Sequence, residues 1–251
     1  MGREMEKDLL AAIEGAFEGG ATEILVADSH SVGMNVSPNS LPDRVRLVRG
    51  YPRTYYMMAG LDESFDVAFF VGYHAPAGYL HGQMDHTYSS FSIYEVRVNG
   101  EIFGESELNA LYAGELGVPI GLITGDKALF EFSSPKFPET TRFVVTKEGM
   151  SRFSALLYPV QEVRAEIRRK AEDAAKNAGS LELFRRRPEN GEYVVELTLL
   201  DTVRADLASI MPGMERVDGR TVRYHAKSAS EVMRVVHATA IMGAYARYLT
   251  G

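Results

Sequence analysis

The sequence predicts an α/β fold: a central, mostly parallel sheet flanked by helices, followed by a smaller C-terminal α+β domain. Three observations predict it. Strand-like and helix-like segments alternate along the first half of the chain. Val67–Val71 is a continuous apolar run, which is typical of a strand buried on both faces. The 251 residues are 45% hydrophobic, which is enough for a sizeable core.

Helical and strand-like patterns divide the first half into short elements separated by turn residues. Apolar residues from Met5 to Phe17 recur at helical spacing and predict an opening helix that ends at Gly19-Gly20. Asn99-Gly100 predicts a hairpin turn. The other expected elements are strands at 23–27, 45–48, 67–71, 92–98 and 119–124, a loop at 31–43 and a helix at 105–116.

The pattern changes near residue 148, so we expect a metal-binding α/β domain over 1–147 and a smaller α+β domain over 148–251. Asp201 and Ser228 are expected helix caps, and Glu231 completes a capping-box pattern with Ser228. The expected elements are helices at 160–178, 201–211 and from 228 onward, strands at 193–199 and 221–226, and a turn at Asp218-Gly219.

Composition excludes several classes of protein. The chain has no cysteine, so disulfides and thiol nucleophiles are excluded, and a metal would need His, Asp or Glu. The net charge of -7 argues against a nucleic-acid partner. No run of 18 apolar residues occurs, and no apolar segment follows the charged N-terminus, so we expect no membrane span and no signal peptide. These features predict a cytoplasmic protein.

Two histidines follow expected strands, where ligands of open α/β sheets collect. His30 ends Asp28-Ser29-His30, and His74 ends Gly72-Tyr73-His74. Glu105, at the start of a helix, can add a carboxylate, and such a set suits zinc. Each residue alone is open to a structural interpretation: a hydrogen-bonded histidine, or a carboxylate favoured by the helix dipole.

A Gly-containing loop carries two more histidines, His81 and His86. It is either a place for a general acid or base or a polar surface loop. His225 and His237 are interpreted as structural, and Asp126 as a helix cap rather than a phosphate site. No Gly-rich phosphate fingerprint and no G-x-S-x-G elbow occur, so nucleotide binding and that type of serine hydrolase lack support.

An ordered set of short motifs resembles the D-aminopeptidase (DppA) family of self-compartmentalising zinc peptidases, from the first helix to the C-terminus. The motifs are Asp28-Ser29-His30, Gly72-Tyr73-His74-Ala75, Asp85-His86-Thr87, Gly104-Glu105, Leu108-Asn109-Ala110, Ala113-Gly114, Gly125-Asp126, Met211-Pro212-Gly213 and Asp218 to Val222. No single tripeptide is specific, but the ordered set is.

The resemblance implies a two-domain subunit with a two-zinc site, assembled into a homodecamer of stacked rings around a chamber. Such enzymes remove N-terminal residues, with D-residues preferred in the founding member, from short peptides or amino-acid amides. Carried over by motif, His30, His74 and Glu105 match zinc ligands, and His86 matches the histidine proposed to act in catalysis. His81 has no counterpart in the family pattern.

The family pattern also includes an N-terminal strand with an Asp-x-Glu motif, whose two acids complete the zinc site. This sequence opens with the helix that follows that strand. We expect either that the true start lies upstream or that the chain is a truncated form. A real loss would leave unpaired backbone groups inside the sheet and a His2Glu site for one zinc ion.

The sequence therefore predicts a zinc-dependent aminopeptidase. Two alternatives stay open: a degenerate, non-catalytic binding protein, and a metal-dependent amidase of a non-peptide substrate. Tyr55-Tyr56-Met57-Met58 is either an exposed interface or part of the core.

Overall fold

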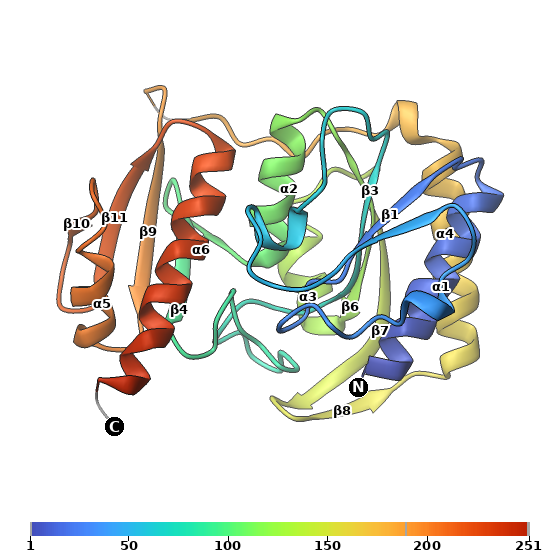
Figure 1. The fold of residues 1–251 in the computed structure, drawn as a ribbon. Coiled ribbons are helices and arrows are strands. Elements are labelled where there is room, and N and C mark those ends of the chain that lie inside the picture. Colours follow the sequence, from blue (N-terminus) through green and yellow to red (C-terminus); the bar gives the residue numbers. More distant parts are fainter. Residues whose placement is uncertain (1, 189, 250–251) are drawn as a thin grey trace.

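The computed structural model describes residues 2–188 and 190–249, and the strands in these ranges form three separate sheets (Figure 1). The four-stranded sheet has the order β3 (Ala68–Tyr73), β6 (Ile120–Asp126), β7 (Arg142–Ser151), β8 (Ser154–Leu157). Its first three strands are parallel, and β8 is antiparallel to β7. All seven residues of β6 are buried, so β6 is the centre of this sheet.

Helices cover both faces of the four-stranded sheet. Helices α1 (Gly2–Glu18) and α4 (Val160–Lys176) pack against each other on one face. Helices α2 (Glu105–Glu115) and α3 (Lys127–Ser133) lie on the other (Figure 1). Complete burial of Ile120, Leu122 and Ile123 between these layers stabilises the fold, at about 1.5–3 kcal/mol for each side chain.

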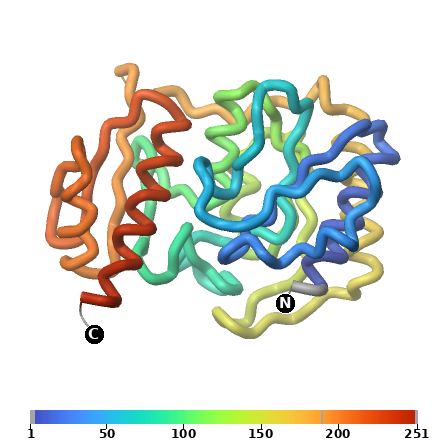
Figure 2. The backbone as a smooth tube through the Cα atoms, viewed as in Figure 1, coloured from blue at the N-terminus to red at the C-terminus, as the bar shows by residue number. Residues whose placement is uncertain are grey.

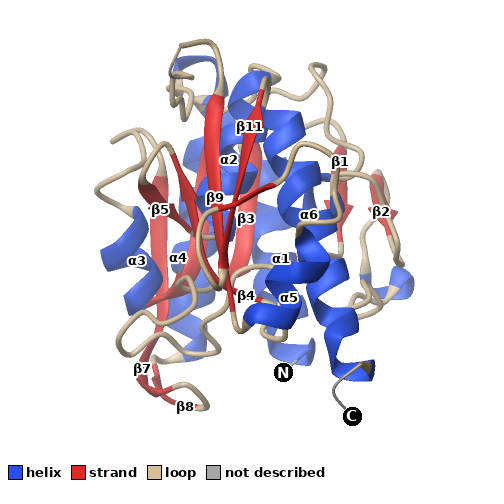
Figure 3. Cartoon of the chain, turned by 90° about the vertical axis from the view of Figure 1, so that its left-hand side faces the viewer, coloured by secondary structure: helices blue, strands red, loops and turns tan. Residues whose placement is uncertain are grey.

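A separate parallel pair consists of β1 (Ile24–Ala27) and β2 (Val45–Val48). Figure 3 shows this pair apart from the other strands. Two short 3-10 helices lie nearby, Pro38–Ser40 before β2 and Tyr56–Met58 after it. Met57 and Met58 are buried, and Tyr55 and Tyr56 are half-buried, so this segment packs mainly into the core.

The third sheet is antiparallel, with the order β10 (Glu215–Arg216), β11 (Thr221–Ala226), β9 (Tyr193–Leu199), β4 (Ile93–Val98), β5 (Glu101–Phe103). Every second residue of β9 is buried, because one sheet face packs against helices α5 (Thr202–Ala208) and α6 (Ala229–Tyr245). Helix α6 also packs against α2, which places these two helices between the sheets (Figure 1).

Sheet membership does not follow the order of the chain. Strands β4 and β5, from the first half, complete the antiparallel sheet, and α4, from the second half, packs on α1. Figure 2 shows the backbone crossing between the two parts more than once. The division at 147–148 thus stays a prediction from sequence order, and each predicted half contributes to the packing of the other.

Most of the expected elements are present, and the α/β class is confirmed. Asn99 and Gly100 both have positive φ values, 51° and 76°, as a tight hairpin turn requires. Asp126 caps α3, and Asp201 caps α5. Ser228 caps α6, while Glu231 accepts the Lys227 N–H rather than that of Ser228. Sequence patterns missed β7 and β8, and they indicated α3 only through its cap, Asp126. No helix among the described residues is long and apolar enough to span a membrane.

Candidate metal centre

The structure brings His74, His86 and Glu105 together. One potential ligand atom from each of the three lies within 4.8 Å of the others. Nε2 of His74 is 3.5 Å from Glu105 Oε2, and Nε2 of His86 is 3.5 Å from Glu105 Oε1. The two imidazole rings stack with centroids 4.0 Å apart. Two nitrogen donors therefore face one carboxylate.

Each of the three residues comes from a different element. His74 follows the last residue of β3, as the sequence predicted for a strand end. Glu105 is the first residue of α2, where the helix dipole favours a negative charge. His86 lies on the loop between β3 and β4. The Tyr88 N–H from the same loop donates a 2.8 Å hydrogen bond to Glu105 Oε1, which fixes the carboxylate against the loop.

Backbone carbonyls orient both imidazole rings. Nδ1 of His74 is 3.0 Å from Ala75 O, and Nδ1 of His86 is 2.7 Å from Met84 O. A carbonyl only accepts, so each Nδ1 carries the proton and each Nε2 keeps its lone pair. The two Nε2 lone pairs thus face the Glu105 oxygens, and these groups repel one another because all of them are acceptors. A cation bound between them would relieve this repulsion. This donor set suits zinc.

Burial lowers the pKa of His74, because the charged imidazolium loses its contact with water. The nearby Glu105 carboxylate acts in the opposite direction, but its effect is smaller. The neutral ring is the form that binds metals. Three tyrosines surround the same carboxylate. Burial and then the Glu105 charge raise the pKa of Tyr56 to about 12, and they raise the pKa of Tyr73 and Tyr88 as well. These hydroxyls therefore stay protonated.

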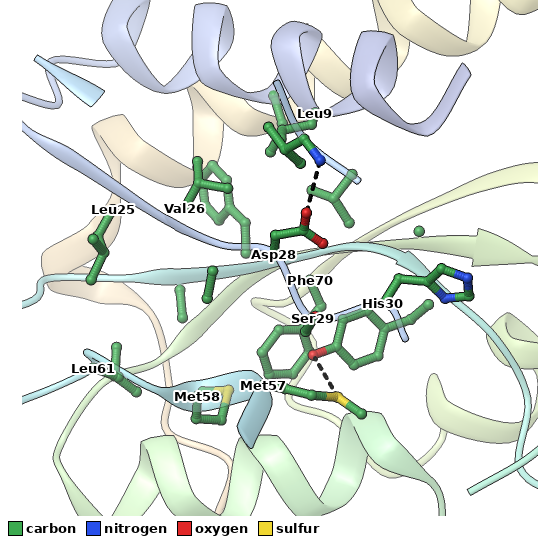
Figure 4. A pocket seen from close by; sticks show the side chains of 18 of the residues that line it. Leu9, Leu25, Val26, Asp28, Ser29, His30, Met57, Met58, Leu61 and Phe70 are labelled. Atoms are coloured by element: carbon green, nitrogen blue, oxygen red, sulfur yellow. Dashed lines mark hydrogen bonds between the residues drawn. The ribbon is translucent and has the colours of Figure 1, made fainter. Parts of the chain in front are cut away.

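His30 lies outside this three-residue group. Its side chain is exposed, on the loop that follows β1. It lines the same cavity as His74, His86 and Glu105, which has a volume of about 310 Å³. Figure 4 shows Leu25 and Leu61 at one end of this cavity and His30 at the other. The ligand role of His30 and the catalytic role of His86 stay predictions.

Neighbouring acids have structural partners. Asp28 accepts backbone N–H groups from Asn35 and Val36, so it fixes the loop after β1. Asp85 accepts from Gly78 N and Arg152, and does not orient His86. His81 is exposed, and His225 lies on β11 beside Glu192. Sequence reasoning missed Tyr56 and Tyr88, because nothing in their local pattern marks them as neighbours of Glu105.

The cavity separates β1 from β3. Ile24 and Asp28 donate their backbone N–H groups to the β2 side, at Arg44 O and Val48 O. Because strand residues alternate, Leu25 and Ala27 point their backbone groups to the other side. No strand among the described residues pairs with this second edge of β1. Strand β3 pairs with β6 on one edge, and no described strand pairs with its other edge. The cavity thus lies between two open strand edges, both of which line it.

Comparison with known proteins agrees with this arrangement. The family model described as D-aminopeptidase matches residues 1–238. The chain belongs to the D-aminopeptidase family. The resemblance inferred from the motifs is confirmed.

A curated relative and a solved structure show how closely the chain follows other D-aminopeptidases. The D-aminopeptidase of Bacillus subtilis (strain 168) is 29% identical over 233 residues, which are 92% of this chain and 83% of the relative. The solved structure of the Zn-dependent D-aminopeptidase DppA from Bacillus subtilis, described as a self-compartmentalizing protease, matches with a TM-score of 0.89. It is 27% identical, and the match covers 96% of this chain and 86% of that one.

Proposed function

We propose that this chain is a zinc-dependent aminopeptidase, a hydrolase that removes N-terminal residues, including D-residues, from short peptides or amino-acid amides. One observation carries the proposal: the Nε2 atoms of His74 and His86 both face the Glu105 carboxylate beside an open cavity. The names of the curated relative and of the solved structure, both D-aminopeptidases, support the substrate class.

His74 and Glu105 would hold the metal, with His30, which lines the same cavity, as a further ligand. When bound, zinc polarises the scissile carbonyl and lowers the pKa of a water molecule. His86 keeps its Nε2 lone pair because Met84 O holds the proton on Nδ1. It can therefore accept a proton at Nε2 and return it to the departing amine.

Additional carboxylates would allow a second zinc ion. The family pattern places two acids on a strand, and the open edges of β1 and β3 support an extra strand between them. Their unpaired backbone groups would be satisfied by such a strand. With His30, His74 and Glu105 alone, the site would hold one ion.

The proposal includes assembly into a homo-oligomer, with a decamer as the expected size. The relative described as self-compartmentalizing supports assembly. Exposed apolar side chains on the β7–β8 hairpin supply surface for contacts between copies: Met150, Phe153, Leu156 and Leu157 are 58–77% exposed. An enclosed chamber would restrict substrates to short peptides. A cytoplasmic location stays a prediction.

A non-catalytic binding protein is the second candidate, in which the cavity beside His74, His86 and Glu105 binds a ligand without hydrolysing it. Metal content per chain, on protein purified without a metal-affinity tag, separates the candidates. Two zinc ions support the complete peptidase site, and one supports the reduced site. No zinc after dialysis against zinc would leave the binding protein. A substrate panel separates the peptidase from a metal-dependent amidase.

The role of His86 needs its own variant. If His86 moves a proton, His86→Ala abolishes hydrolysis and keeps the zinc content of the unsubstituted chain. If His86 is a metal ligand, the variant loses zinc as well. Hydrolysis at the unsubstituted rate would contradict both roles.

A further inference from the structure

A second cavity, of about 350 Å³, opens beside the metal centre, and six of its 13 lining residues carry aromatic rings. Its walls come from α6, from the loop after β1 and from the loops around residues 51–56 and 88–89. The rings that line it are Tyr51, Tyr56, Tyr88, His237, Tyr245 and Tyr248. Aromatic walls bind apolar side chains through large contact area and ring-on-ring packing.

The inner rings are held in a fixed arrangement. His237 stacks on Tyr56 with centroids 4.9 Å apart, and Tyr51 meets His237 edge-on at 5.9 Å. Hydrogen bonds add to the packing: the Tyr56 hydroxyl donates to Ser31 O at 3.1 Å, and the Tyr88 hydroxyl to Met233 Sδ at 3.2 Å. A wall fixed in this way loses little conformational freedom when a ligand binds.

Charge at this cavity is low. Arg247 is its only permanently charged lining residue within the described chain, and its guanidinium already donates to the Tyr248 hydroxyl at 2.8 Å. His237 is largely neutral at neutral pH, because burial lowers its pKa and nearby Arg53 lowers it further. No acidic side chain of the described residues lines the cavity. These features favour an uncharged, apolar ligand group.

The cavity adjoins the cavity that contains the metal centre. Ser31, Tyr56 and Tyr88 line both this cavity and the one that contains His74, His86 and Glu105. Tyr88 connects them directly, since its N–H donates to Glu105 while its ring forms part of the aromatic wall. A substrate whose scissile bond lies at Glu105 can therefore place a neighbouring side chain against these rings.

We propose that this aromatic pocket is a specificity site, which binds a large apolar side chain, aromatic or branched aliphatic, next to the scissile bond. The proposal rests on the proposed aminopeptidase function. A volume of about 350 Å³ is near the lower end of small-ligand pockets, about 300–1,000 Å³. The pocket therefore suits one side chain rather than a longer peptide.

Filling the pocket tests its role. Ile241 lines it from α6 and is 46% exposed, so Ile241→Trp narrows the pocket without disturbing the core. The matched control is Arg234→Trp, at an exposed position of the same helix outside the lining. The substrates are the amides of phenylalanine, leucine and alanine, each as both enantiomers, with kcat/KM as the readout.

The unsubstituted chain should favour phenylalanine or leucine amide over alanine amide by about tenfold or more, a typical effect of added methylene groups in an apolar pocket. Ile241→Trp should remove most of this preference, and Arg234→Trp should retain it. If all three amides are hydrolysed alike, with no effect at position 241, the pocket assignment is overturned while the aminopeptidase proposal stands.

Calorimetric binding of phenylalanine amide covers the case in which nothing is hydrolysed. Binding that is weakened by Ile241→Trp and not by Arg234→Trp supports the pocket, although the aminopeptidase proposal then fails. Absence of binding overturns the pocket as well.

Discussion

Glu105 is the residue that links the two imidazoles of the candidate centre, because each of its oxygens faces one Nε2 atom. Glu105→Gln keeps the size of the side chain and an oxygen for the Tyr88 N–H, but removes the charge. We expect zinc affinity to fall by at least about tenfold to a hundredfold, the range seen when even indirect partners of a metal are removed. Calorimetric titration with zinc measures the affinity of the variant and of the unsubstituted chain.

The matched control is Glu131→Gln, at an exposed position on α3. It makes the same chemical change away from the centre, so its zinc affinity should equal that of the unsubstituted chain. Equal affinity in Glu105→Gln and Glu131→Gln would contradict the assignment of Glu105 as a ligand.

His237 should make stability depend on pH, since burial and Arg53 lower its pKa below the ordinary value of 6.5. Below pH 6.5 the unfolded chain then binds more protons at this residue than the folded chain does. Stability supplied by the neutral ring is present above pH 6.5 and is lost as the pH falls through the lower folded-state pKa. Urea unfolding between pH 7.5 and 5 measures the loss.

His237→Asn should flatten this part of the profile. The variant also loses the stacking on Tyr56, but that loss shifts stability equally at every pH. If stability depends on pH in the same way in the unsubstituted chain and in His237→Asn, His237 does not titrate as described.

Local sequence identified His74 and Glu105 because each stands at the end of a recognisable element, after a strand and at the start of a helix. It could not identify Tyr56, which approaches Glu105 only through the packing of a distant loop. Nor could it show that His86 faces the carboxylate while His30 remains exposed, since both belong to loops whose paths depend on tertiary contacts.

At the scale of elements, α1 and α4 pack closely because glycines lie where they meet: Gly15 in α1 and Gly19 directly after it. A Cβ built on Gly15 would lie 2.1 Å from the Arg168 carbonyl oxygen, and one on Gly19 would lie 2.4 Å from that of Glu172. The helices must separate to accept any side chain at either position. The expected helix at 160–178 was correct, but the sequence did not indicate that its partner would be α1.

Gly15→Ala therefore sets two effects against each other. Alanine favours a helix over glycine by about 1 kcal/mol. Overpacking against a backbone atom costs about 1–3 kcal/mol, and the contact here is with a carbonyl that cannot rotate away. We expect net destabilisation, measured as a lower urea midpoint. Gly179→Ala is the control: a Cβ there meets nothing within 4 Å, so its stability should change little.

At the scale of the molecule, sequence patterns predicted the α/β class because they depend on local runs of apolar residues. In the structure, β6 is buried along its whole length and β9 is buried at every second residue. The sequence patterns could not predict that β4 pairs with β9, about a hundred residues further along the chain. They also missed β8, a four-residue edge strand whose position depends on pairing with β7.

The metal centre joins distant parts of this fold, so metal binding should stabilise the whole molecule. His74 follows β3, His86 lies on the next loop and Glu105 begins α2, so an unfolded chain cannot present the three together. A ligand that binds only the folded state adds about 2.7 kcal/mol to the free energy of unfolding when its concentration is about a hundred times its Kd. Zinc should therefore raise the thermal midpoint, and a chelator should reverse the rise.

Two histidine variants separate this effect from zinc binding elsewhere. His74→Ala removes one of the proposed zinc ligands, so added zinc should no longer raise its midpoint. His225→Ala removes a histidine from β11, outside the three-residue group, and should retain the full rise. An equal rise in both variants would mean that zinc acts away from the centre. If zinc raises the thermal midpoint of His225→Ala and not that of His74→Ala, zinc stabilises the fold by binding at the centre between β3 and α2.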